Sequence, residues 1–359
     1  MGSTQYTSIN SQYNNTILLI GLKQNSKLHE LNAILQCLCH IEPIINYVKY
    51  KYDYIKEINS YMIHKKNGKS LAHALKKIIY KLWPDDDFEN KKIYTKTEDS
   101  KEFLEMIYKI EPKYNAETNP LIKFLQENLH KELNKGANAI HEYCYKIDKS
   151  NKKLVLNNYA KNFVKENMSI VSDLFFGTYY RYTQFIYCKH ELYDFGFYSF
   201  TIYNLFEIKK MKCNMNNLSI TSPMILNIHD CLFYDQRVLY NFETCKKCCK
   251  SLQCCYKNII FIPPKILCFT FNKSVPNNTR FLIDEYINID AYIEVQTNSK
   301  YELIGVIYFF YPNRYIAFCK NPINKMWYSY ENEKVQQANF NIFQKMFIIP
   351  YTLFYQIEE

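Results

Sequence analysis

The sequence of 359 residues contains little glycine and little arginine, and it lacks a long apolar run. Only seven glycines serve the whole chain, so its turns must rely on Asn, Asp and Pro. One of the longest apolar runs, IIFIPPKILCFTF at 259–271, is interrupted by Pro263, Pro264 and Lys265. It falls short of the ~18 apolar residues that a membrane-spanning helix needs. We therefore expect no membrane-spanning segment.

Arginine is scarce although the formal net charge is +10. The arginines are Arg181, Arg237, Arg280 and Arg314. The remaining positive charge comes from lysines that are scattered among Asn, Ile and Tyr from end to end. Specific recognition of phosphates and bases usually employs arginine side chains. The scattered lysines indicate a compositional bias, and we do not expect nucleic-acid binding.

A secretory signal is also missing, because the polar N-terminus has neither a basic start nor an apolar core. We interpret residues 1–16 as a flexible N-terminal arm, since they show no sustained apolar period. The thirteen cysteines are therefore expected to stay reduced inside the cell, in the nucleus or the cytoplasm. With 48% hydrophobic residues, the rest of the chain can fill a sizeable core.

The spacing of apolar residues divides the chain into a helical half and a strand-rich half. Up to about residue 110 the apolar residues recur with a helical period, as in Leu31, Ile34, Leu35 and Leu38, and residues 111–170 are polar and helix-leaning. After Ser172, short runs rich in Tyr, Phe, Ile and Val predict strands. These runs are 178–188, 265–271, 301–311, 314–319 and 350–357. Helices followed by strands predict an α+β fold with a mainly antiparallel sheet.

The stretch GLKQNSKLHELNAILQCL at 21–38 reads as a polar loop that enters an amphipathic helix. A residue at a helix N-terminus lies beside free backbone N–H groups and the positive end of the helix dipole. These lower the pKa of a thiol and can stabilise an oxyanion. A cysteine at this place would be a nucleophile. The sequence has His29 there instead.

This stretch resembles, in register, the motif GLxNLGNTCYxNSxLQCL, which opens the catalytic domain of the ubiquitin-specific protease (USP) family, peptidase family C19. The matching residues are Gly21, Leu22, Asn32, Leu35, Gln36, Cys37 and Leu38. By this resemblance, His29 falls on the nucleophilic cysteine, and Gln24 falls where the family keeps an oxyanion-hole Asn. Ser26 and Lys27 replace a Gly-Asn pair of the loop.

The resemblance continues, in the order of the family, over nearly all of the chain beyond the arm. DSKEFL at 99–104 resembles DAxEFL, residues 174–188 resemble LFxGxxxxxxxC, and residues 261–273 resemble LPxxLxxxLKRF. The last three segments are 301–318, which looks like YxLxAVIxHxGxxxxGHYxAY, 327–335, which looks like WxxFDDxxV, and 350–357, which looks like AYxLFY. In these segments Arg314 falls on the general-base histidine, and Asn332 falls on the third position of the catalytic triad.

The resemblance implies a papain-like cysteine-protease core of the USP type over residues 17–359. A helical thumb would occupy about 17–170, and an antiparallel-sheet palm with fingers would occupy about 171–359.

A cysteine protease requires a thiolate nucleophile and an imidazole that accepts and returns the proton. The imidazole of His29 is a poor acylation site for a peptide-type bond, and the side chain of Arg314 has no acceptor atom. Cys37 lies eight residues beyond His29, which is ~12 Å along a helix. It is therefore out of reach, and we expect it to pack in the core.

A second group of potential ligands consists of Cys188, His190 and the segment CKKCCKSLQCC at 245–255. The C-x-x-C turn of Cys245 and Cys248 presents two thiolates to one tetrahedral Zn²⁺ ion. The resemblance implies a second C-x-x-C in the fingers, where this sequence has Cys188 and His190. We predict a structural zinc site formed by these four residues. Reserve ligands are Cys213, Cys249, Cys254 and Cys255. The alternative is that the fingers have lost their metal and the cysteines merely pack.

Three hypotheses for the function follow. The first is a catalytically inactive USP-like protein that binds ubiquitin, or that docks into a larger assembly. The inactive USP-like component of the spliceosome is a resembling precedent, because its opening motif also lacks the cysteine. The second is an active deubiquitinase with a rearranged active site. The third is a scaffold with no ubiquitin binding.

Overall fold

The computed structural model describes residues 19–24, 29–52, 70–84, 100–115, 120–136, 152–272, 278–294, 298–346 and 348–358. The predicted arm at 1–16 and the loop residues Ser26 and Lys27 lie outside the described residues. In the described part, helices precede strands, so the predicted α+β class is confirmed. None of the described helices is both long and apolar enough to span a membrane.

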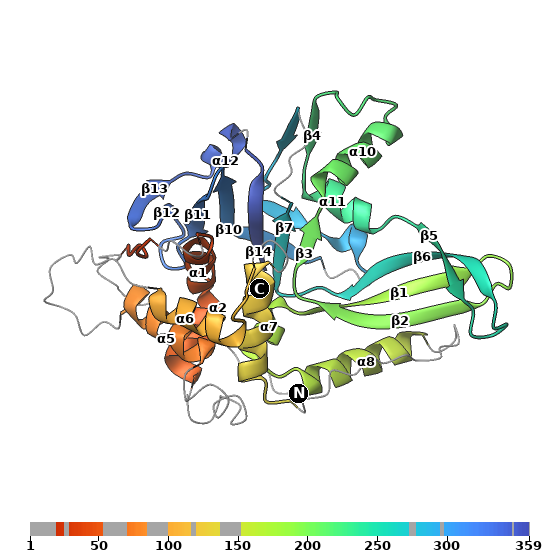
Figure 1. Cartoon of the computed structure of the whole chain (residues 1–359), viewed down its shortest axis with the longest axis horizontal. Helices are drawn as coiled ribbons and strands as arrows, with labels where there is room; N and C mark the ends of the chain where they lie inside the picture. Colours follow the sequence, from red (N-terminus) through yellow and green to blue (C-terminus); the bar gives the residue numbers. More distant parts are fainter. Residues whose placement is uncertain are drawn as a thin grey trace, which may run out of the picture.

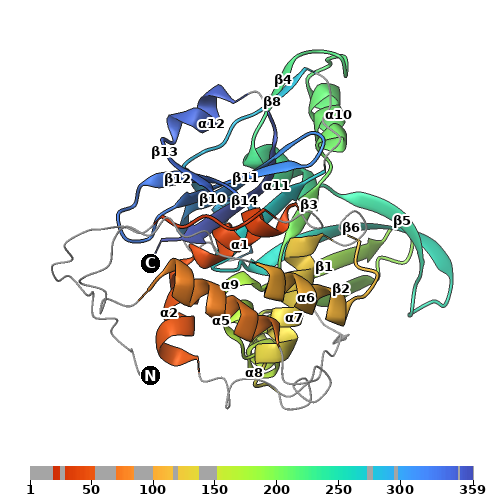
Figure 2. The same cartoon turned by 60° about the vertical axis from the view of Figure 1, so that its left-hand side comes forward.

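The helical half begins with α1 (Leu31–Cys39), of which every residue is buried. The other elements are α2 (Glu42–Asn46), the π-helix η1 (Tyr47–Lys51), α5 (Leu71–Leu82), α6 (Lys101–Ile110), α7 (Leu121–Leu133), α8 (Lys152–Glu166) and α9 (Ile170–Phe175). α1 contacts α2 and α5 on one side and strands of the largest sheet on the other. It therefore lies between the sheet and the remaining helices (Figure 1, Figure 2).

The largest sheet has eight strands in the order β13-β12-β11-β10-β14-β7-β3, with β9 paired to β10. Their bounds are β3 (Thr201–Tyr203), β7 (Ile266–Phe271), β9 (Tyr286–Asn288), β10 (Lys300–Phe310), β11 (Arg314–Lys320), β12 (Trp327–Glu331), β13 (Lys334–Ala338) and β14 (Pro350–Ile357). All pairs except β3 with β7 are antiparallel. The strands predicted at 265–271, 301–311, 314–319 and 350–357 are thus confirmed.

The central strands of this sheet are buried on both faces, which explains why they read as continuous apolar runs rather than alternating ones. Ile307 and Cys319 face the core that includes α1, whereas Val306 and Phe318 face a second core. The second core is covered by α10 (Leu205–Met215), α11 (Ile228–Asp235) and α12 (Asn341–Lys345). Nearby lie the short parallel pair β4 (Met224–Leu226) and β8 (Thr279–Phe281), and the 3₁₀ turn η3 (Asp290–Tyr292).

A four-stranded antiparallel sheet in the order β2-β1-β6-β5 extends from the body of the molecule (Figure 1). Its strands are β1 (Gly177–Phe185), β2 (Glu191–Tyr198), β5 (Leu239–Thr244) and β6 (Ser251–Ile262). We call this sheet the fingers. α8 lies along it, and Leu156 and Tyr159 of α8 share a small core with Tyr180 and Phe195 of the sheet. β1 confirms the strand predicted at 178–188, although it ends at Phe185.

Candidate functional site

The N-terminus of α1 lies where the sequence places the nucleophile. α1 begins at Leu31, and His29 lies two residues earlier with a partly exposed side chain. No side chain caps the helix at Glu30, so the first backbone N–H groups of α1 are not taken by an N-cap side chain. The position is therefore suited to an anion or a thiolate, but the residue there is an imidazole.

A hydrogen-bond network ties Asn332 to the start of α1. The Asn32 Nδ2 donates to Lys23 O at 2.7 Å and to Asn332 Oδ1 at 3.0 Å, and Ser100 Oγ donates to Asn32 Oδ1 at 2.8 Å. Leu22 N donates to Asn332 O at 3.0 Å. Asn332, at φ +51°, is thus held beside the helix although 300 residues separate it from Asn32. A Cβ on Gly21 would lie 2.4 Å from Asn332 O, so only glycine fits there.

Arg314, at the predicted general-base position, forms a bidentate ion pair with Glu331. Its Nη2 lies 2.7 Å from Glu331 Oε2, and its Nε contacts Glu331 Oε1. The hydrogen bond with Glu331 raises the pKa of Arg314, and the same pair lowers the pKa of Glu331. The guanidinium therefore stays protonated and has no lone pair for proton transfer.

Two similar turns, which we call the knuckles, meet at the tip of the fingers. In the first, Lys189 N donates to Phe185 O at 3.0 Å, and in the second, Cys249 N donates to Cys245 O at 2.8 Å. Lys189 and Cys249 have nearly the same positive φ, 56° and 54°. By this match Cys188 corresponds to Cys248, and Phe185 corresponds to Cys245. The first knuckle thus has a buried phenylalanine where the second has the thiol of Cys245.

The knuckles bring three of the four predicted ligands together, and the fourth, His190, contacts only Cys245 among them. The Sγ atoms of Cys188, Cys245 and Cys248 all lie within 4.8 Å of one another, and His190 Nδ1 lies 3.3 Å from Cys245 Sγ. Burial acts to raise the pKa of Cys245, but hydrogen bonds from Cys248, Lys247 and His190 outweigh it and lower the pKa to about 6. A thiolate among thiols and an imidazole is a donor set that suits a tetrahedral metal ion such as Zn²⁺. The cluster therefore could hold a metal ion.

The model of the family described as "Ubiquitin carboxyl-terminal hydrolase" matches residues 29–355. The chain belongs to the ubiquitin carboxyl-terminal hydrolase family. A solved yeast structure, the SAGA DUBm with a mutant Sgf73, is similar in fold at a TM-score of 0.64. The match has 16% sequence identity and covers 97% of this chain and 71% of the yeast chain. The predicted fold, a USP-type core with a helical thumb, a palm and fingers, is thereby confirmed.

In this hydrolase-family chain, a buried carboxylate lies directly after His29. Glu30 is only 3% exposed, and Tyr351 donates to its Oε2 at 3.2 Å. Burial, and secondly the charge of Glu30, raise the pKa of both Tyr315 and Tyr351 above the usual range. Sequence reasoning did not find Glu30. The feature of the sequence that indicates burial of Glu30 is its place directly before α1, a helix that contains no charged residue.

The cysteines near α1 of this hydrolase-family chain are buried. Cys37 is 3% exposed, and Cys319 donates to its sulfur at a sulfur–sulfur distance of 3.7 Å. Burial raises the pKa of Cys39, Cys268 and Cys319. The expectation that Cys37 packs in the core is confirmed. Gln24, at the predicted oxyanion position, has an exposed side chain, and its backbone N donates to Glu333 Oε1 at 2.9 Å.

Proposed function

We propose that this chain is a catalytically inactive member of the ubiquitin carboxyl-terminal hydrolase family that acts by binding. The observation that supports this most directly is the ion pair of Arg314 with Glu331 at the predicted base position. An arginine that is held by a carboxylate cannot accept a proton from a nucleophile. His29 offers no thiol, and the described cysteines closest to it in sequence, Cys37 and Cys39, are buried. The chain therefore supplies neither a thiolate nucleophile nor an imidazole base at these positions.

The ligand that we propose is ubiquitin or a ubiquitinated protein, bound within a multiprotein assembly. Family membership supports the first part, because the fold that recognises ubiquitin is retained. The second part is supported by the yeast structure, whose fold is similar and which was solved as the SAGA DUBm with Sgf73. Binding without turnover is compatible with the intact network of Asn32, Ser100 and Asn332, which holds the thumb against the palm.

We also propose that the knuckles bind one structural Zn²⁺ ion. Cys188, Cys245 and Cys248 would provide three thiolates. His190 would provide the fourth ligand, because Phe185, which corresponds to Cys245, has no ligand atom. Structural zinc contributes its binding free energy to folding, because the ligands come together only in the folded chain. Here it would join the turns after β1 and β5 at the tip of the fingers.

Two measurements test the binding proposal. An electrophilic ubiquitin probe should leave the wild-type protein unlabelled, whereas an active deubiquitinase with a rearranged site would form a cysteine adduct. Calorimetric titration with ubiquitin should show saturable binding. A titration that reaches ~1 mM without a saturable signal corresponds to less than ~4 kcal/mol of binding free energy. That result would leave only the scaffold hypothesis.

A further inference from the structure

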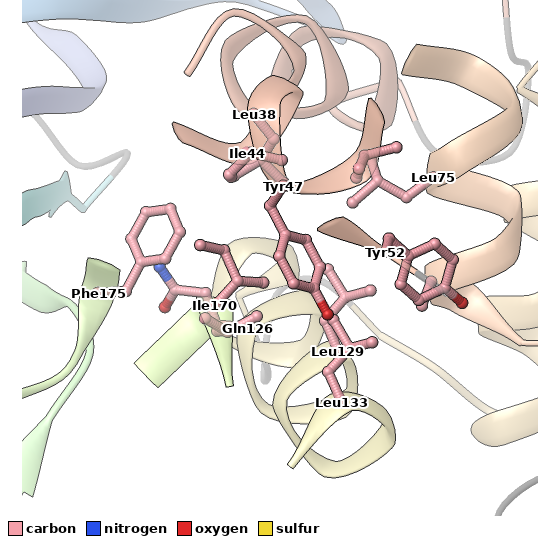
Figure 3. Close-up of a pocket in the computed structure, with 13 residues that line it drawn as sticks. Leu38, Ile44, Tyr47, Tyr52, Leu75, Gln126, Leu129, Leu133, Ile170 and Phe175 are labelled. Atoms are coloured by element: carbon pink, nitrogen blue, oxygen red, sulfur yellow. The ribbon is translucent and has the colours of Figure 1, made fainter. Parts of the chain in front are cut away.

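The cavity in the helical half is too small to be a ligand site. Figure 3 shows it around the ring of Tyr47, and its volume is about 30 Å³. That is room for roughly two water molecules, whereas a small-molecule pocket has about 300 Å³ or more. The surface of the fingers offers a larger site, because the structure gathers positive charge and exposed aromatic rings there.

Four lysines meet at the tip of the fingers (Figure 1). They are Lys189 of the first knuckle and Lys246, Lys247 and Lys250 of the second. The two knuckles are in contact, since Cys188 Sγ lies 3.6 Å from Cys245 Sγ. All four lysines are exposed, and in the described part of the chain none of them forms an ion pair. Their ammonium groups are therefore available to an anionic partner.

The tip stays positive when the other charges near it are included. In the two segments 185–191 and 244–252, Glu191 is the one carboxylate. Three thiolates and one Zn²⁺ ion, bound as proposed above, add a single negative charge. Glu243, just before the second knuckle, forms an ion pair with Arg181. The four ammonium groups outnumber these negative charges, so the tip is suited to a polyanion.

Three aromatic rings are exposed close to these lysines. Tyr187 of the first knuckle is 73% exposed, and Tyr240 and Phe242 on β5, an outer strand of the fingers, are 67% and 69% exposed. Because residues i and i+2 of a strand point to the same face, the side chains of Tyr240 and Phe242 lie about 7 Å apart on one face. Lys257 on β6 points to this face too, since Cys255, two residues before it, is opposite Tyr240.

The combination of lysines with exposed rings favours one class of partner. The core of a protein interface is enriched in aromatic residues but depleted in lysine. A flat membrane that touched the knuckles would not reach Tyr240, which lies five residues before Cys245, or about 16 Å along a strand. A single strand of nucleic acid fits both features, because its phosphates pair with ammonium groups and every base has a π-face that stacks on a ring.

We propose that the tip and the β5 edge of the fingers bind a single strand of nucleic acid, with phosphates on the knuckle lysines and bases stacked on Tyr240 and Phe242. The knuckles contain no arginine, so we expect binding without sequence preference. The spacing of lysines along the sequence does not reveal this surface, because 57 residues separate Cys188 from Cys245 and the knuckles meet only in the fold. The inference goes beyond the ubiquitin binding proposed above and does not depend on it.

Fluorescence anisotropy of the full chain with a labelled ten-nucleotide oligothymidylate tests the role of the lysines. Binding should saturate, and the logarithm of the association constant should fall with the logarithm of the salt concentration at a slope of about −2 to −3, as for three or four phosphate contacts. Lys246→Gln with Lys250→Gln should make this slope shallower by about 1.4. Lys334→Gln with Lys345→Gln removes the same charge from β13 and α12 and should leave the slope unchanged.

The same titration tests the rings. Tyr240→Ala and Phe242→Ala should each weaken binding about fivefold or more, because the stacking of a base is lost. Tyr50→Ala is the matched control: it removes a ring that is 75% exposed on η1, in the helical half, and it should bind as the wild type does. Circular dichroism checks that each variant keeps the wild-type fold.

Polyglutamate and vesicles of phosphatidylserine with phosphatidylcholine serve as competitors of other chemistry. Both should displace the labelled strand far less effectively, per negative charge, than unlabelled oligothymidylate does. Equal displacement by either one would overturn the proposal in favour of an acidic protein segment or a membrane. Wild-type affinity in both Tyr240→Ala and Phe242→Ala would overturn it too, since the surface would then recognise charge alone, and so would an absence of saturable binding.

Discussion

By the resemblance of the sequence motifs, we predict that His29 and Arg314 occupy the two positions at which the family chemistry needs a thiol and an imidazole. Because triad residues act as a unit, restoring one should recover little activity. We predict that the wild type and His29→Cys do not cleave ubiquitin chains, since Arg314 stays paired with Glu331. The double variant His29→Cys with Arg314→His should cleave measurably, with Asn332 to orient the new imidazole. A gel-based cleavage assay with diubiquitin makes the comparison.

Arg314→His alone is the matched control for that double variant and should remain inactive. Cleavage by the unmodified protein that is abolished by changing one of its cysteines would contradict the assignment of His29. Full recovery is not expected, because Asn32 already uses Asn332 Oδ1, and the new imidazole must compete for it.

His40 is a buried neutral imidazole at the end of α1. Its Nδ1 lies 2.7 Å from Gln36 O, and its Nε2 lies 2.8 Å from the hydroxyl of Tyr330 on β12. Burial lowers the pKa of His40 to about 4, and burial likewise lowers the pKa of His130 to about 4. Below pH 6.5 the unfolded chain takes up protons that the folded chain excludes, so the free energy of unfolding falls as the pH falls.

We predict that the two histidines together remove about 4 kcal/mol of stability between pH 7.5 and pH 5, or about 2 kcal/mol each. Urea unfolding at the two pH values measures the loss. His40→Gln should lower stability at pH 7.5 but should reduce the pH-dependent loss by about half. An unchanged pH dependence in His40→Gln would show that His40 is not the titrating group.

At the scale of elements, the knuckles make a prediction about metal. Purified, reduced protein should contain close to one zinc per chain by elemental analysis. Cys245→Ser should lose the metal, because Cys245 contacts both Cys188, at a sulfur–sulfur distance of 3.6 Å, and His190. Cys249→Ser is the matched control: Cys249 lies in the same knuckle but is exposed and outside the cluster. Equal zinc content in the two variants, or none in the wild type, would contradict the site.

The helices around Leu31, Leu71 and Phe103 and the main strands could be predicted from the sequence, because hydrophobic periodicity is a local signal. Contacts between distant segments could not. The pairing of Asn32 with Asn332 depends on how the sheet meets α1, and no local pattern reveals it. The match between the two knuckles could not be predicted from the sequence either, because the first knuckle has no C-x-x-C pattern. Only its hydrogen bonds show that Phe185, three residues before Cys188, corresponds to Cys245.

At the scale of the molecule, the eight-stranded sheet contributes to two cores at once. Ile307 on β10 and Cys319 on β11 face the helical half, and Val306 and Phe318 on the same two strands face the opposite core. A strand that leaves one core must therefore leave the other. This arrangement favours a single cooperative transition for thumb and palm, as in a small two-state domain, although the chain has two recognisable halves.

The two tryptophans of the chain report on opposite sides of the sheet and allow a test of this cooperativity. Trp83 follows α5, and its Nε1 donates to Cys39 O at 2.7 Å, whereas Trp327 on β12 packs against Phe343 of α12 with ring centroids 5.1 Å apart. In Trp83→Phe only Trp327 fluoresces, and in Trp327→Phe only Trp83 does. We predict that in each variant the fluorescence midpoint in guanidinium coincides with the midpoint by circular dichroism. If Trp83 instead reports an earlier transition than circular dichroism in the same variant, the thumb unfolds on its own and the shared sheet does not couple the two cores.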